Sequence, residues 1–216
     1  IIGMLVAILL PALSKARLAA QATQCLSQIR QCGMASIMYA NDHKGMFQVY
    51  YLDSFNEYRW VRRLNEMGYL SNHKKVTVCP TAKQVETWDQ NNIYGALMDI
   101  DSRYRIRTTV GTPQYTYLRL LSVQSPAEYM YMADTAFTNP ASTAWLNPIA
   151  SLYFNSTNFT INMLHSNTTA AAFADGHAKL ADVDGVFAAS RTMYVANTPP
   201  ATIAFVQKGE RVQITR

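Results

Sequence analysis

The chain has 216 residues, of which 49% are apolar, 15% charged and 11% aromatic. This composition excludes an intrinsically disordered protein, because disorder needs few aromatic residues and a high net charge, and the length suits one domain of ordinary size. The formal net charge of +5 comes from short basic groups without a long run. These groups indicate a solvated surface rather than a patch for nucleic acid, and we expect no nucleic-acid partner.

The first 13 residues, IIGMLVAILLPAL, carry no charge, and only Gly3 and Pro11 interrupt their apolar character. A helix of this length rises about 20 Å, less than the ~30 Å hydrocarbon core of a bilayer. We therefore expect either a buried helix or the second half of a membrane span. The abrupt start without Met favours a processed or truncated chain over a secretory signal peptide, since no basic segment precedes the apolar one and no small-residue cleavage site follows it.

Helical character continues from Ser14 to Ala40. Small and apolar residues alternate there at intervals of four and three, which is typical of one face of an amphipathic helix: Leu18, Ala22, Cys25, Ile29, Cys32, Ser36 and Tyr39. Asn41, Asp42 and Gly45 then supply stop signals. The sequence predicts one helix of about forty residues, about 60 Å long. A domain of this size cannot cover all of it, so lipid or copies of the same helix must cover the apolar front half.

We expect the helix, residues 1–41 with an apolar front half (1–13) and an amphipathic second half (14–41), to pack on a globular head, residues 42–216. The class is α+β with a mainly antiparallel sheet. A short helix is predicted at Asn56–Met67, a hairpin turn at Asp175-Gly176, and a loop from Asp134 to Asn158. Runs rich in Val, Thr, Tyr and Phe predict strands: Val76–Cys79, Gln114–Leu121, Tyr129–Ala133, Phe159–Leu164, Thr168–Phe173, His177–Ala181 and Ile203–Val206.

Several motifs resemble one protein family. Residues 1–13 look like the latter part of the N-terminal helix of type IV pilins and type II secretion pseudopilins. His165 is followed by nine residues and then Asp175-Gly176, which resembles the signature of the prepilin-type proteins found in planctomycetes, verrucomicrobia and lentisphaerae. Further motifs resemble the same proteins: Cys25-Leu26-Ser27-Gln28-Ile29-Arg30-Gln31, Met38-Tyr39-Ala40-Asn41-Asp42, Cys79-Pro80, Tyr94-Gly95, and Ser125-Pro126 with Asp134 downstream. Cys32 departs from the family pattern, where an aliphatic residue is expected.

The resemblance implies a structural subunit of an extracellular type IV pilin-like filament, a helical homopolymer, and not an enzyme. It implies a precursor inserted in the inner membrane, cut by a prepilin peptidase, methylated, and assembled by pilus machinery on the bacterial cell surface. About eleven residues, including an acidic one, would precede Ile1. Apolar side chains of the front half would build the filament core: Ile1, Ile2, Met4, Leu5, Val6, Ile8, Leu9, Leu10 and Leu13. Because Pro11 removes a backbone donor, the stretch from Gly3 to Pro11 would either unwind in the filament or kink.

Three other interpretations stay open. One is a pseudopilus subunit that works in protein secretion. Another is a monomeric, membrane-anchored binding module, in which exposed aromatic residues such as Trp60, Trp88 and Trp145 would line a ligand groove. The third is a metal hydrolase that uses His165, Asp175 and His177, since zinc accepts imidazoles and a carboxylate.

The sequence predicts no cofactor. Several residues of strand would separate His165 from Asp175 and His177, so we favour a structural role for all three over a metal site. Some pseudopilins that the chain resembles bind calcium through a C-terminal loop. Asp175, Asp182 and Asp184 could offer oxygens to calcium, but their pattern does not match that loop closely.

The chain has three cysteines, Cys25, Cys32 and Cys79. Cys25 and Cys32 lie about 10 Å apart on one helix, beyond the roughly 4.4–6.8 Å between bridged Cα atoms, and cannot pair with each other. An exported protein can keep disulfides. The resemblance favours a Cys25–Cys79 disulfide, because both belong to its motifs, with Cys32 as a small buried hydrophobe. The alternative is three reduced, buried thiols.

Overall fold

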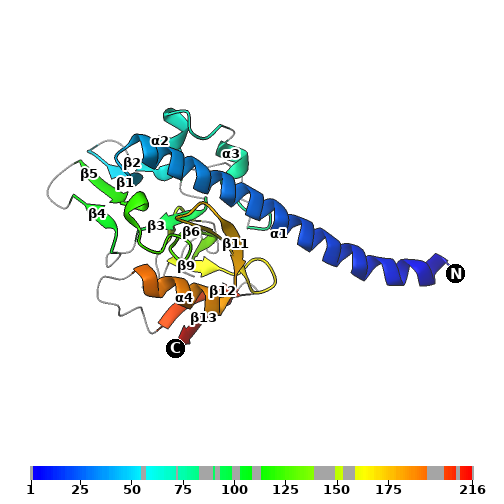
Figure 1. Ribbon diagram of the computed structural model, residues 1–216. Helices are drawn as coiled ribbons and strands as arrows, with labels where there is room; N and C mark the ends of the chain where they lie inside the picture. Colours follow the sequence, from blue (N-terminus) through cyan, green and yellow to red (C-terminus); the bar gives the residue numbers. More distant parts are fainter. Residues whose placement is uncertain are drawn as a thin grey trace.

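A computed structural model of the chain describes residues 2–54, 57–71, 73–82, 90, 93–98, 103–108, 113–138, 149–152, 159–193, 202–207 and 210–215. Helix α1 (Ile2–Asp42) projects from a globular head that contains the strands of the described segments (Figure 1). The predicted class, α+β with a long N-terminal helix on mainly antiparallel sheets, is confirmed.

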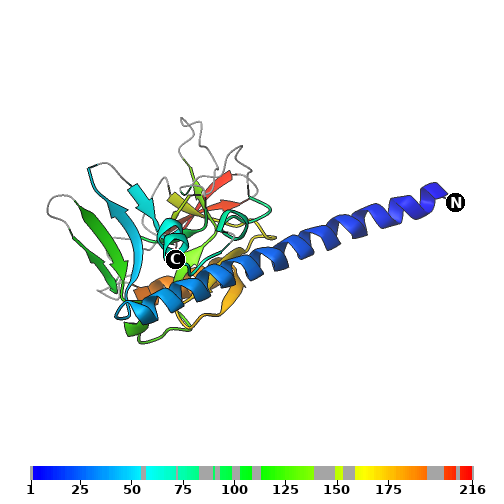
Figure 2. The same cartoon turned by 90° about the horizontal axis from the view of Figure 1, so that it is seen from above.

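Helix α1 has 41 residues and runs without a break through Pro11, as predicted. It ends where Gly45, at a φ of +79°, donates its N–H to the carbonyl of Ala40 at 2.8 Å; this left-handed conformation is one that glycine adopts without strain. Of the predicted amphipathic face, the residues from Cys25 to Tyr39 are buried against the head. Leu18, nearer the N-terminus on the same face, is 53% exposed. Figure 2 shows the front half of the helix extending well beyond the head.

The described residues form three small sheets in the head. The first is antiparallel, with order β2 (Glu57–Arg59), β1 (Phe47–Leu52), β5 (Gln114–Leu118), β4 (Arg105–Arg107). The second has order β11 (Ala178–Ala181), β10 (Thr169–Phe173), β6 (Met130–Ala133), β3 (Gly95–Leu97), β8 (Ser151–Leu152), and only its β3–β8 pair is parallel. The third has order β13 (Glu210–Thr215), β12 (Thr202–Gln207), β9 (Phe159–Asn162), β7 (Thr135–Phe137), and its β12–β9 pair is parallel.

The second half of α1 packs mainly on β10 and β11 of the second sheet. Small residues permit this close approach: a Cβ at Gly33 would lie 3.2 Å from the Cβ of Ala172 on β10. The Tyr131 hydroxyl of β6 donates to the Gly33 carbonyl at 3.0 Å. Four short helices complete the described elements: α2 (Trp60–Glu66), α3 (His73–Val76), η1 (Leu120–Ser122) and α4 (Val183–Met193).

Three local predictions are wrong, and the predicted strand Gln114–Leu121 is too long, because Leu120–Ser122 form η1. The predicted strand Val76–Cys79 is absent, because Val76 ends α3, where the Thr77 N–H and hydroxyl both donate to the His73 carbonyl. The start of the predicted helix Asn56–Met67 is strand β2, which pairs with β1. The predicted loop from Asp134 to Asn158 contains strands β7 and β8. In each case a partner distant in sequence, or a local cap, outweighs composition.

The tryptophan groove expected for a binding module is also not supported at Trp60. This side chain is fully buried, and its indole N–H donates to the Tyr94 carbonyl at 3.1 Å. Trp60 therefore belongs to the core of the head and cannot line a ligand groove. Trp88 and Trp145 lie outside the described residues.

Candidate functional site

The apolar front of α1 lies outside the head domain. Its side chains, predicted to form a filament core, are exposed by 45% to 79%: Ile2, Met4, Val6, Ile8, Leu9, Leu10 and Leu13. Ile1 and the side chain of Leu5 lie outside the described residues. The helix is long and apolar enough to span a membrane, and none of its most apolar 18-residue window is buried. Burial of each such side chain is favourable by about 1.5–3 kcal/mol of free energy. Burial of this surface in lipid or against another chain is therefore strongly favourable.

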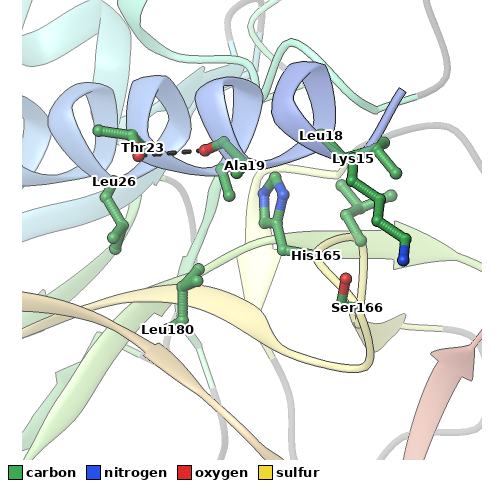
Figure 3. A pocket seen from close by; sticks show the side chains of 10 residues that line it. Lys15, Leu18, Ala19, Thr23, Leu26, His165, Ser166 and Leu180 are labelled. Atoms are coloured by element: carbon green, nitrogen blue, oxygen red, sulfur yellow. Dashed lines mark hydrogen bonds between the residues drawn. The ribbon is translucent and has the colours of Figure 1, made fainter. Parts of the chain in front are cut away.

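A groove of about 640 Å³ lies between α1 and the head, where the helix leaves the domain (Figure 3). Leu18, Ala19 and Leu26 line it from the helix side. The connection between β9 and β10 supplies the opposite side with His165, whose ring points toward α1 beside Ala19 in Figure 3. The groove thus extends the apolar surface of α1 into the head and ends at a histidine.

Beside the groove, four buried side chains from distant parts of the sequence come together. Cys25 is on α1, Cys79 follows α3, Asp134 lies between β6 and β7, and His165 lies in the β9–β10 connection. One ligand atom from each of these residues lies within 4.8 Å of all the others. The exposed fraction of these residues is 6% or less. We call this set the four-ligand cluster.

The distances within the four-ligand cluster are short. Cys79 Sγ lies 3.2 Å from His165 Nε2, and Cys25 Sγ lies 3.5 Å from Asp134 Oδ2. His165 Nε2 lies 3.6 Å from the same Asp134 oxygen. Further polar groups hold the ligands from outside: the Tyr94 hydroxyl at 3.2 Å from Cys25 Sγ, the Thr81 hydroxyl at 3.0 Å from Cys79 Sγ, and the Ala170 N–H donating to Asp134 Oδ2 at 3.2 Å.

Burial and proximity shift the protonation of all four groups. The hydrogen bond with Cys25, assisted by His165 and Thr81, lowers the pKa of Cys79 to about 5 against the opposing effect of burial. Burial raises the pKa of Cys25 well above its usual range. Burial and the nearby Cys79 raise the pKa of Asp134 to about 7. Burial lowers the pKa of His165, but hydrogen bonds with Asp134 and Cys79 outweigh it and raise the value to about 9. At neutral pH these shifts favour a Cys79 thiolate beside a protonated His165, while the Cys25 thiol keeps its proton.

The arrangement does not match a nucleophilic triad. In a Cys-His-Asp triad the acid orients the base through the ring nitrogen that the nucleophile leaves free. Here Cys79 and Asp134 both approach Nε2 of His165. In addition, Cys79 is only 2% exposed, which leaves no access for a substrate at the sulfur. Four possible ligand atoms within 4.8 Å of one another are instead an arrangement that could hold a metal ion.

All three cysteines are free thiols in the structure, which therefore does not contain the predicted Cys25–Cys79 disulfide. The two residues are nevertheless brought together, and both belong to the four-ligand cluster. Asp134 and His165 join them on the other side, which gives the sulfurs polar partners other than each other. Cys32 is buried elsewhere on α1, where its thiol donates to the Val76 carbonyl at 3.3 Å.

The three residues considered as a metal set from the sequence, His165, Asp175 and His177, do not lie together in the structure. His165 precedes strand β10, whereas Asp175 and His177 follow it and pair with each other, Nδ1 to Oδ1, at 2.6 Å. Asp182, considered for calcium, accepts the Gly185 N–H at 2.8 Å and so caps the start of α4. The five-residue strand β10 therefore separates His165 from the Asp175–His177 pair, as the sequence predicted.

We expect replacement of Asp175 by asparagine to produce a small, pH-dependent loss of stability. Partial burial raises the pKa of Asp175, but hydrogen bonds from the His177 N–H and ring outweigh it and lower the pKa. Because the pKa of Asp175 is lower in the folded state, its carboxylate contributes its full stabilisation at pH values above the ordinary pKa near 4. The contribution is lost as the pH falls through the lowered pKa. For so exposed a pair the loss is about 0–1 kcal/mol.

Thermal unfolding of the wild type and of D175N, compared from pH 7 down to pH 3, checks this expectation. The difference in Tm shrinks toward acid pH if the carboxylate stabilises the turn. A difference that grows toward acid pH contradicts it.

Sequence reasoning did not connect the members of the four-ligand cluster. Cys25 and Asp134 are 109 positions apart, and no spacing rule links them. A signal was nevertheless present: Cys25, Cys79, Tyr94, Asp134 and His165 all belong to the short motifs that carry the resemblance. Their motifs come from separate elements, and only the fold shows that they share one location.

The comparisons with known proteins give no independent identification of this site. No protein-family model, no curated protein and no solved structure matches the chain.

Proposed function

We propose that this chain is the structural subunit of a bacterial surface filament and polymerises with itself through the apolar front of α1. The observation that carries the proposal is the position of residues 2–13, which project from the head with the described large apolar side chains exposed. The resemblance of the same residues to pilin helices supports it.

The energetics of helix packing support assembly. If each front helix buries about 800 Å² of apolar surface against its neighbours, about 25 cal/mol per Å² gives roughly 20 kcal/mol before the losses of freedom on association. Packing one flank of a helix against a different flank of the next is a heterologous contact, which produces an open helical polymer. The groove beside Leu18 and Leu26 extends this apolar surface toward the head.

Before assembly, the membrane covers the same surface. A helix of this length and composition can cross a bilayer, so the subunit would wait in the inner membrane until a prepilin peptidase and pilus machinery act on it. The stretch from Gly3 to Pro11 is helical in the monomer. In the filament it would unwind or kink, because Pro11 leaves one backbone hydrogen bond unmade.

A second candidate is a membrane-anchored binding module, or a pseudopilus subunit of a secretion system. The groove between α1 and His165 favours the binding module, because concave apolar sites of this volume hold small ligands. A pseudopilus and a surface pilus differ in filament length. Both differ from an anchored binding module in that their subunits associate with one another.

Electron microscopy of material sheared from the cell surface tests the proposal. We expect long, uniform fibres in which mass spectrometry identifies this chain as the main component. Recovery of the chain only as monomers in the membrane fraction would overturn the proposal in favour of the anchored module, and short, cell-bound fibres would favour a pseudopilus.

A further inference from the structure

We propose that the four-ligand cluster binds one structural Zn²⁺ ion, with Cys25, Cys79, Asp134 and His165 as its ligands. The inference stands on the geometry of the head and is independent of filament formation.

Three of the six separations between the ligand atoms fit a tetrahedral zinc ion, and all six are within 4.8 Å. Zinc bonds of about 2.0 Å to oxygen and nitrogen and about 2.3 Å to sulfur place ligand atoms about 3.3–3.8 Å apart along the edges of a tetrahedron. The separations in the structure are 3.2 Å for Cys79 to His165, 3.5 Å for Cys25 to Asp134 and 3.6 Å for His165 to Asp134. Binding an ion would therefore require movements of only a few tenths of an ångström along these edges.

The donor set selects the metal. Two thiolates, one imidazole and one carboxylate suit zinc, whereas Ca²⁺ and Mg²⁺ need shells of oxygen atoms. Four protein ligands complete a tetrahedral shell, and such closed sites are structural, since catalytic zinc keeps one position for water. The burial of all four residues agrees with a closed site.

The surroundings of the four-ligand cluster are those of a supported metal site. The Tyr94 and Thr81 hydroxyls lie beside the two sulfurs, and the Ala170 N–H donates to the carboxylate. Outer groups of this kind fix the orientation of metal ligands. His165 also lines the groove, so one of the four ligands borders a space open to solvent.

The position of the site explains what the metal would do. Cys25 is on α1, whereas the other three ligands belong to the head, so the ion would join the helix to the domain. The strongest competing arrangement is a disulfide between Cys25 and Cys79, which would occupy the same two sulfurs.

The inference can be tested by native mass spectrometry and elemental analysis of the full chain. The chain is purified in detergent with its thiols protected from air oxidation and is then titrated with Zn²⁺. We expect one zinc ion per chain, a Zn–S distance of about 2.3 Å by X-ray absorption, and a Tm that falls when a chelator removes the ion and recovers when Zn²⁺ is restored. We expect C79S and H165A to lose the bound zinc.

C32S is the matched control, because Cys32 is equally buried on the same helix but lies outside the four-ligand cluster; this variant should retain one zinc ion. D134N keeps the shape of the carboxylate and should lose zinc even if the cysteine variants fail to fold. A folded wild-type chain that takes up no zinc overturns the proposal, as does an intact mass that shows a Cys25–Cys79 disulfide in the protein isolated from cells. Zinc that remains bound in D134N and H165A would place the metal elsewhere and overturn it as well.

Discussion

Replacement of Leu9 by arginine is expected to abolish filament formation while the head domain still folds. Leu9 is 62% exposed and belongs to the front half of α1, which extends beyond the head (Figure 2). In the proposed filament its side chain lies among neighbouring helices, and burying an unpaired charge there costs several kcal/mol per subunit. Since each 1.4 kcal/mol is a tenfold change in an equilibrium constant, we expect filament yield to fall by about 100-fold or more.

The yield of sheared fibres, counted by electron microscopy, measures this effect. An immunoblot of the membrane fraction separates failed assembly from failed insertion, because a charge in the middle of a membrane helix also opposes insertion. L121R is the matched control: Leu121 is 47% exposed on η1 of the head, and the same change there should leave fibres intact. Wild-type fibre yield from L9R would contradict assembly through this surface.

Addition of one methyl group at Gly95 is expected to destabilise the head by about 2–6 kcal/mol. Gly95 lies on β3, inside the second sheet, and a Cβ there would lie 2.5 Å from Thr135 Cγ2 and 2.9 Å from the Ser151 carbonyl carbon. Overpacking of this kind costs about 1–3 kcal/mol. Displacing Thr135 would also break the hydrogen bond that its hydroxyl donates to the Ile149 carbonyl, which adds about 1–3 kcal/mol.

Denaturant unfolding of G95A in detergent, followed by tryptophan fluorescence, to which the buried Trp60 contributes, gives the free energy of unfolding. G3A makes the same chemical change where a Cβ meets nothing within 4 Å, so its head should unfold like the wild type. Equal stability of G95A and G3A would show that the second sheet adjusts easily at β3, contrary to this packing.

The candidate site depended far more on tertiary structure than the fold did. The hydrophobic period from Cys25 to Tyr39 identified the face of α1 that is buried, because a helical face is set by residues three and four positions apart. No comparable local rule covers Asp134, whose partners come from α1, the segment after α3 and the β9–β10 connection. Spacing along the chain pointed to His165, Asp175 and His177 as the possible metal set, but only His165 belongs to the four-ligand cluster. Asp175 and His177 pair with each other at the turn.

The sequence by itself determined the long helix, its end near Asp42, its uncovered apolar front and the α+β class, because these features depend on composition and period along one segment. The tertiary structure decided which strands pair and that Trp60 is part of the core. It also brought together the side chains of the four-ligand cluster. The physical reason is that a strand or a metal ligand needs a partner distant in the chain, and only the folded backbone sets that distance.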